Sequence, residues 1–180
     1  RIKLLSSRGV RAIITRCAKL KHLNLDGLTL IDEETFLAAT LPQGLTYLSM
    51  RDCPGVGDGA VRQITRTIGP AIKVLRLARC PTISDKSVAF ISKFCTELAT
   101  LDLSRRVEKG LPGTYIVLSD EAIHKLFAEG ACSKLRELDL TLNTEIDGSC
   151  FQQLNHTSLL TLSLRDCKKM NIMGMASALY

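Results

Sequence analysis

Aromatic residues are scarce in this chain: tryptophan is absent, and phenylalanine and tyrosine together make up 4% of the 180 residues. The core must therefore be built from aliphatic side chains, which are plentiful because 46% of the residues are hydrophobic. No run of 18 apolar residues occurs, so we expect no membrane-spanning segment and no membrane partner. The first residues lack the apolar core of a signal peptide. Because the chain starts with Arg1, we expect a piece of a longer protein.

A large excess of charge of one sign is also missing. The chain has 24 Lys and Arg residues against 18 Asp and Glu residues, a net charge of +6 at pH 7. A solvated surface explains so modest an excess better than an acidic partner or nucleic acid does. Aromatic platforms on which single-stranded nucleic acid could stack are absent as well. We therefore do not expect a nucleic-acid partner.

The sequence does contain one short phrase, apolar-x-x-apolar-x-apolar, in six near-copies. The copies begin at residues 20, 45, 72, 98, 135 and 159, so the steps between them are 25, 27, 26, 37 and 24 residues. A period of about 20–29 residues carrying this phrase is typical of a leucine-rich repeat, a strand-plus-helix unit that stacks on its neighbours. The predicted fold class is an α/β leucine-rich repeat solenoid, or horseshoe. Its parallel strands line the concave face and its helices cover the convex face.

We predict one domain over residues 1–180. It consists of a partial repeat at 1–16, an insertion at 105–117, and repeats that start near residues 17, 42, 69, 95, 132 and 156. No repeat can bury its leucines alone, so stability must come from stacking. An open solenoid end exposes apolar surface, and we expect further chain or a partner to cover both ends.

Six of the seven cysteines occupy two fixed places, eight residues after the start of the phrase or three residues before it. They are Cys53, Cys80 and Cys167, and Cys17, Cys95 and Cys132; Cys150 falls outside both series. Equivalent positions in stacked repeats form parallel columns with no reason to pair, so we expect small buried free thiols. No CxxC pair or Cys/His cluster with ligand spacing occurs, so no zinc site is expected. Reduced thiols indicate the cytoplasm or the nucleus.

Three expected helix starts share an Asp that lies two residues after one apolar residue and three before another: Asp58, Asp85 and Asp120. Ser7 occupies the same place in the partial repeat at 1–16. Such a side chain just ahead of an apolar-periodic run caps the free N–H groups of a helix. A carboxylate there also opposes the positive end of the helix dipole. We predict that these aspartates cap helices whose inward faces are Val61, Ile64 and Ile68; Val88, Ile91 and Phe94; and Ile123, Leu126 and Phe127.

The combination LxxLxLxxC followed by I-x-D-x-x-[LV] resembles the cysteine-containing leucine-rich repeat subtype of F-box/LRR proteins and their relatives. Leu45–Cys53 with Val56–Val61, and Ile72–Cys80 with Ile83–Val88, match it most closely. The late cysteine is replaced in three repeats, by Leu28, Arg106 and Asn143. The resemblance implies protein recognition, because the subtype serves ubiquitin-ligase substrate receptors, DNA-repair subunits, cell-cycle proteins and axonemal proteins. Residues 1–16 already belong to a repeat, so an adaptor of a ubiquitin ligase is expected to dock only through a segment outside this chain.

No catalytic, cofactor or metal site is expected. His22, His124 and His156 lie in different repeats, and none has the partners of a nucleophilic triad. Gly55–Gly59 lacks the lysine and Ser/Thr of a phosphate-binding loop. We interpret it as a strand-to-helix turn in which glycine supplies unusual backbone angles. The chain is therefore predicted not to be an enzyme and to bind no cofactor.

Alternation along the strands predicts which side chains face the concave surface. The predicted columns are basic around Arg51, Arg76 and Arg79, near Tyr47. They are acidic around Asp102, Glu137 and Asp139. Such a surface could read a charged peptide, and the alternative is that it is merely solvated.

The fourth repeat carries an insertion. From Leu98 to the helix start at Leu118 there are 20 residues, against 11 in four other repeats, and the nine extra ones fall within Arg105–Val117. Insertions in repeat proteins emerge on one edge, often the binding edge. We hypothesise partner contacts by Arg105, Arg106, Lys109, Leu111 and Tyr115. The alternative is a tolerated insertion whose end, from Tyr115 on, folds back on neighbouring turns.

These features predict a protein–protein interaction module. The resemblance implies the substrate-recognition part of an F-box/LRR-type ubiquitin-ligase subunit. The competing interpretation is a structural scaffold subunit of a larger assembly, such as an axonemal or DNA-repair complex.

Overall fold

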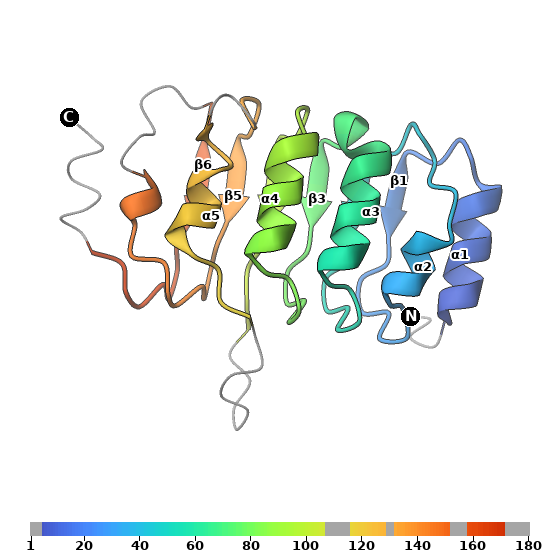
Figure 1. Cartoon of the computed structure of the whole chain (residues 1–180), viewed down its shortest axis with the longest axis horizontal. Helices are drawn as coiled ribbons and strands as arrows, with labels where there is room; N and C mark the ends of the chain where they lie inside the picture. Colours follow the sequence, from blue (N-terminus) through green and yellow to red (C-terminus); the bar gives the residue numbers. More distant parts are fainter. Residues whose placement is uncertain (1–4, 107–115, 129–131, 152–157, 172–180) are drawn as a thin grey trace.

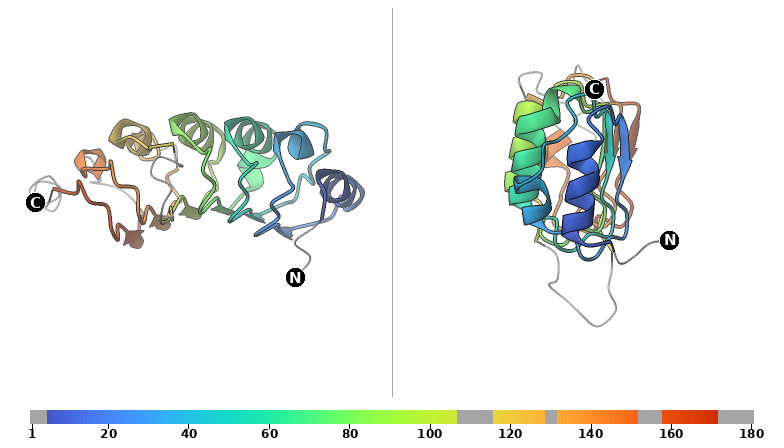
Figure 2. Two further views of the ribbon diagram at one scale, coloured as in Figure 1. Left: turned by 90° about the horizontal axis from the view of Figure 1, so that it is seen from below. Right: turned by 90° about the vertical axis from the view of Figure 1, so that its right-hand side faces the viewer.

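The computed structural model describes residues 5–106, 116–128, 132–151 and 158–171. One sheet of six parallel strands runs through the molecule in the order β1-β2-β3-β4-β5-β6, and helices lie along one of its faces (Figure 1). Viewed from below, the chain forms an arc with the helices on the outer side and the strands on the inner side (left view of Figure 2). The predicted α/β solenoid is confirmed.

Each strand has three residues and starts two residues after the start of a phrase. The strands are β1 (His22–Asn24), β2 (Tyr47–Ser49), β3 (Val74–Arg76), β4 (Thr100–Asp102), β5 (Glu137–Asp139) and β6 (Thr161–Ser163). Equivalent residues pair in register from β1 to β6, without an offset. The middle leucines therefore form one column, in which Leu48 and Leu101 are 0% exposed. This column is the start of the aliphatic core that the sequence predicts.

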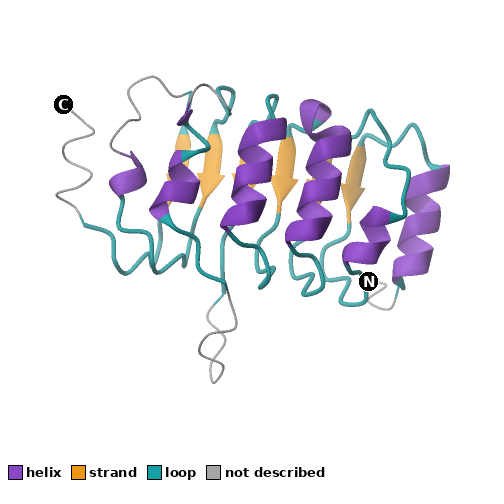
Figure 3. Ribbon diagram, viewed as in Figure 1, coloured by secondary structure: helices purple, strands orange, loops and turns teal. Residues whose placement is uncertain are grey.

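Helices and 3₁₀ turns lie on the convex side of the sheet (Figure 3). They are α1 (Ser7–Arg16), α2 (Glu33–Leu37), α3 (Asp58–Ile68), α4 (Asp85–Phe94) and α5 (Asp120–His124), with 3₁₀ turns η1 (Gly69–Ala71) and η3 (Ser149–Phe151). The helices α2 and α5 have only five residues each. Leu126 and Phe127 therefore follow α5 instead of lying in it, although Leu126 is still buried. No helix within the described residues is long and apolar enough to cross a membrane.

The predicted helix caps are wrong in one respect: the capping residues are Gly57, Ser84 and Ser119, each directly before the aspartate. The aspartate bonds to the following repeat instead. Asp58 accepts hydrogen bonds from the Ser84 N–H at 3.0 Å and the Ser87 hydroxyl at 2.5 Å. These carboxylates therefore tie each helix start to the next one.

The same link recurs twice farther along the chain. Asp85 accepts from the Ser119 N–H at 2.9 Å and from its hydroxyl at 2.7 Å. Asp120 accepts from the N–H groups of Asp147, Gly148 and Cys150 at 2.9–3.2 Å. Burial alone would raise the pKa of Asp120, but these donors outweigh it and lower the pKa of this carboxyl group.

The late cysteine column links neighbouring strands. The Cys53 and Cys80 thiols donate to the carbonyl oxygens of Leu25 and Met50, at 3.2 and 3.0 Å. Burial raises the pKa of Cys53 to about 11 and that of Cys80 to about 12, so both stay protonated at neutral pH. All seven cysteines are free, as predicted, but Cys17 is exposed, so its predicted burial is wrong.

The turn after five of the six strands contains one left-handed residue, seven positions after the start of the phrase. These residues are Gly27 (φ 73°), Asp52 (φ 57°), Arg79 (φ 59°), Leu142 (φ 64°) and Asp166 (φ 58°). In the fourth repeat this place belongs to Arg105, which is not left-handed.

Gly55 is needed for a different reason than the sequence suggested. Its φ is not in the left-handed region, but a Cβ atom there would lie 2.4 Å from the Ile31 carbonyl oxygen. Gly55 therefore permits a close approach between two repeats. At Gly59, the first turn of α3, a Cβ would lie 1.5 Å from Glu33 Oε1, so a carboxylate of the preceding repeat contacts this helix start as well.

Candidate functional site

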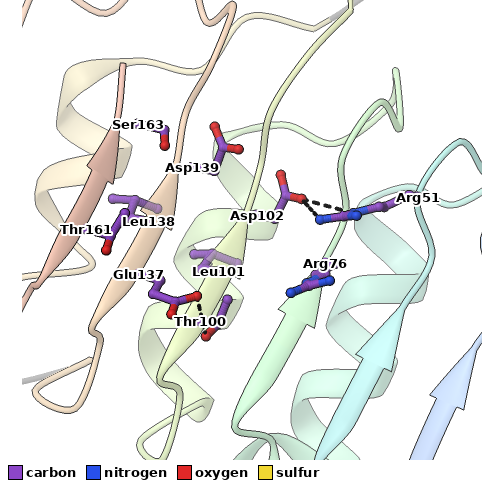
Figure 4. A pocket seen from close by; sticks show the side chains of 10 residues that line it. All are labelled: Arg51, Arg76, Thr100, Leu101, Asp102, Glu137, Leu138, Asp139, Thr161 and Ser163. Atoms are coloured by element: carbon purple, nitrogen blue, oxygen red, sulfur yellow. Dashed lines mark hydrogen bonds and ion pairs between the residues drawn. The ribbon is translucent and has the colours of Figure 1, made fainter. Parts of the chain in front are cut away.

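The concave face carries a shallow polar pocket of about 200 Å³ across β3 to β6 (Figure 4). Its floor is the sheet itself, with Leu101 and Leu138 beneath the polar side chains. Strand register fixes its walls, because Arg76, Asp102, Asp139 and Ser163 are successive partners on neighbouring strands. The predicted charged columns therefore meet in one place.

An ion pair divides the pocket from the N-terminal half of the face. Arg51, just after β2, reaches past β3 to Asp102, with Nε and Nη2 at 3.0 and 2.6 Å from Oδ2. The other oxygen of Asp102 accepts from the Ser104 hydroxyl at 2.7 Å. Asp102 is only 5% exposed, so the prediction that it contacts a partner freely is corrected: its charge is already balanced within the protein.

The basic wall is part of a stacked series of side chains. The Arg76 guanidinium lies 5.7 Å from the Tyr47 ring centroid, and Nη1 lies 3.5 Å from the Tyr47 hydroxyl. The Tyr47 ring stacks on His22 at 5.6 Å with an interplanar angle of 17°. A cation over a tyrosine ring is attracted to its face. Arg76 is thereby oriented at the edge of the pocket.

The acidic wall is β5. Glu137 is exposed and Asp139 is half-buried. Glu137 accepts a hydrogen bond from the Thr100 hydroxyl at 3.2 Å, and Asp139 accepts one from the Thr141 N–H at 2.9 Å. Within the described parts of the chain, neither carboxylate forms an ion pair.

Arg79 lies on the turn after β3 and not in the pocket. It forms a two-point ion pair with Asp52, Nε to Oδ1 at 2.6 Å and Nη2 to Oδ2 at 2.5 Å. Hydrogen bonding to Arg79 lowers the pKa of the Asp52 carboxyl group. The pair joins two neighbouring left-handed turns, so Arg79 supports the rim of the face.

The structure corrects the role predicted for Arg105, which is 7% exposed. Its guanidinium donates to the carbonyl oxygens of Cys80 (2.8 Å), Ile83 (2.9 Å) and Ile116 (3.2 Å), and to Asn143 Oδ1 (3.2 Å). Arg105 therefore joins the third and fifth repeats to the far end of the insertion. It is not available to a partner.

The other predicted contact residues of the insertion are either exposed or lie outside the described part of the chain. Arg106 is exposed, as a contact residue should be. The predicted contacts Lys109, Leu111 and Tyr115 lie outside the described residues. Ile116, where the chain returns, donates its N–H to the Pro81 carbonyl oxygen at 3.0 Å, so this end of the insertion contacts a neighbouring turn.

The excess positive charge is concentrated at the N-terminal end of the chain, which the total composition does not reveal. Residues 1–25 contain seven Lys and Arg residues and no Asp or Glu, so the remaining residues have a net charge of −1. Arg8, Arg16, Lys19 and Lys21 are exposed. Counting charge along the sequence, instead of in total, would have found this. The concave pocket therefore belongs to a nearly neutral body in which local charges dominate.

A second hollow, of about 350 Å³, lies at the N-terminal end of the solenoid. Its lining is mostly apolar and includes Val10, Ile13 and Leu23. Ile13 is 44% exposed. This hollow is the apolar surface that the sequence predicts at an open end of the solenoid. Among the described residues, no group of three His, Cys, Asp or Glu side chains is placed to hold a metal ion.

Comparison with known proteins agrees with the repeat architecture. A family model described as Leucine Rich repeat matches residues 131–149. The DNA repair protein rhp7 of Schizosaccharomyces pombe is 33% identical over 93 residues, which are 49% of this chain and 16% of that protein. The chain thus spans a small part of this curated relative.

Two solved structures share the fold. A chain of the crystal structure of the Rad7 and Elc1 complex in yeast matches with a TM-score of 0.60 and 17% identity, over 97% of this chain and 51% of that one. The tropomodulin C-terminal domain of Caenorhabditis elegans matches with a TM-score of 0.52 and 11% identity, over 96% and 89% of the two chains. At such identities the likeness concerns the fold alone.

Proposed function

We propose that this leucine-rich repeat chain binds another protein through its concave face and is not an enzyme. The observation that carries the proposal is the register of the sheet. Six strands pair without an offset, so polar side chains of all six repeats form one surface. Cross-strand contacts such as Arg51–Asp102 and Tyr47–Arg76 hold several of them. Side chains that are ordered before binding lose little entropy on binding.

Within a larger protein, we propose that the chain is the substrate-recognition part of a DNA-repair assembly of the ubiquitin-ligase type. Two observations support this role. The Schizosaccharomyces pombe relative is a DNA repair protein, and the repeat signature resembles that of F-box/LRR proteins. The proposed location is the nucleus or the cytoplasm, and a repair role favours the nucleus.

Site-specific photo-crosslinking tests the binding face. A benzoyl-phenylalanine is placed in the full-length protein at Arg165, which is exposed just after β6 and outside the pocket, or at Lys86, which is exposed on α4. We expect a discrete protein adduct from position 165 and none from position 86. Adducts from position 86 alone would show that the convex side is the binding face and would refute the proposal. A scaffold role would instead give adducts on both sides.

A further inference from the structure

The two carboxylates of β5 are the acidic side chains of the concave pocket that no ion pair balances within the described residues. Asp102 is paired with Arg51. Glu137 and Asp139 form no ion pair within the described ranges and meet only the neutral donors of Thr100 and Thr141. Asp139 points into the hollow, beside Ser163 (Figure 4). The β5 side of the pocket is thus anionic, and its neighbours on β6 are the hydroxyls of Thr161 and Ser163.

Geometry limits what can occupy it. Glu137 and Asp139 lie two residues apart on one strand face, about 6.6 Å along the strand. Arg76 and Asp139 are separated by one intervening strand, which places them roughly 10 Å apart across the sheet. A bound segment therefore meets negative charge on one side and positive charge on the other.

Size selects the class of ligand. Pockets for small molecules and cofactors commonly have volumes of about 300–1,000 Å³ and mostly apolar linings. This pocket is smaller, about 200 Å³, and polar. It has room for one long side chain. An arginine or lysine head would find two carboxylates and the hydroxyls of Thr161 and Ser163 within reach of its donors.

We propose that the pocket receives an arginine or lysine side chain of the partner protein, held by Glu137 and Asp139, with an acidic residue of the same segment facing Arg76. An extended segment advances about 3.3 Å per residue, so the roughly 10 Å between Arg76 and Asp139 corresponds to a basic residue two to four positions from the acidic one. The Arg51–Asp102 pair keeps Arg51 away from the β5 carboxylates, which leaves them free for the partner. This inference rests on the proposed function and names the partner chemistry at its site.

Selection from a random dodecapeptide phage library on the full chain tests it. We expect enriched peptides to carry a basic residue two to four positions from an acidic one. A fluorescein-labelled member should bind Glu137→Gln/Asp139→Asn about tenfold or more weakly by fluorescence polarisation, as for the loss of charge-assisted hydrogen bonds. The control Glu121→Gln removes an exposed carboxylate of α5 on the convex side and should bind like the parent chain.

The outcomes separate the inference from the function. A bulky thiol label on Thr161→Cys, in a Cys17→Ser background so that only position 161 is labelled, shows whether the peptides bind the concave face. Peptides that this label displaces, but that bind the Glu137→Gln/Asp139→Asn variant as tightly as the parent chain, would overturn the inference and leave the proposed function standing. The absence of enrichment over a bait-free selection would also overturn it. Peptides that bind the chain but are indifferent to the label would count against both. Thermal melts of the double variant confirm that it folds.

Discussion

The third and fourth repeats differ in the residues that form the turn after the strand. In the third, Arg79 makes the left-handed turn at the surface, and the buried Cys80 thiol bonds to the Met50 carbonyl oxygen. In the fourth, Arg105 occupies the turn position but enters the core and bonds to three carbonyl oxygens and Asn143. In the repeat that carries the insertion, the residue at the turn position is therefore buried and forms hydrogen bonds to neighbouring repeats.

Arg105→Met should give the largest effect in this comparison. Methionine keeps an apolar stem but leaves the Ile83 carbonyl oxygen and Asn143 Oδ1 without their guanidinium donor. The Cys80 carbonyl oxygen keeps the Ile83 N–H at 3.5 Å. Each buried acceptor left unsatisfied costs about 1–3 kcal/mol, so we expect a loss of about 3 kcal/mol in unfolding free energy. Urea denaturation followed by circular dichroism measures it.

The matched control is Arg79→Met. It removes an ion pair whose side chains are 33% and 41% exposed, which contributes about 1 kcal/mol or less. Equal losses for Arg79→Met and Arg105→Met would contradict the distinction between the two repeats.

Gly55→Ala tests the close approach between the first and second repeats. Because the new Cβ would lie 2.4 Å from the Ile31 carbonyl oxygen, the backbone must shift, at a cost of about 2 kcal/mol. Gly44→Ala is the control, since nothing lies within 4 Å of its Cβ position. A thermal melt should separate the two variants, and indistinguishable melting temperatures would refute the close approach.

The link made by Asp120 should show as a pH dependence. The pKa of this carboxyl group is lowered by N–H donors of the next repeat, so its stabilisation is present above the unfolded pKa of about 4. It is lost as the pH falls through the folded pKa. Asp120→Asn should be less stable than the parent by about 1 kcal/mol at pH 7.

This difference should shrink toward pH 3. Denaturation midpoints of both proteins across that range measure it. A constant difference at every pH would show that the ionised carboxylate is not what joins the two repeats.

The last prediction concerns the reactivity of the cysteine thiols and involves no change in stability. The native chain should take one N-ethylmaleimide, at the exposed Cys17, whereas the other six thiols are buried and should react only after unfolding. Intact mass spectrometry counts the adducts. Several native adducts would contradict the packed columns.

The sequence was sufficient for the strands because their phrase recurs at nearly equal intervals. It was also sufficient for the concave positions of Arg76, Glu137 and Asp139, since alternation along a strand is a local rule. It was insufficient where a side chain bonds to a distant residue. Asp102 is buried by Arg51, 51 residues away, and Asp58 reaches Ser84, 26 residues away. No local pattern contains those partners.

Arg105 illustrates the same limit. Its neighbours in sequence, Ser104 and Arg106, suggest an exposed polar loop, and an arginine is rarely buried without a partner. Its acceptors are supplied by repeats on either side and by the residue at which the insertion returns. Only the assembled solenoid brings them together.

The most direct test of the account is the affinity of the partner identified by crosslinking for Thr161→Trp, whose indole would fill the pocket from its exposed rim. The account predicts a dissociation constant about tenfold or more higher than that of the parent chain, with an unchanged melting temperature. An unchanged dissociation constant would show that the partner binds elsewhere.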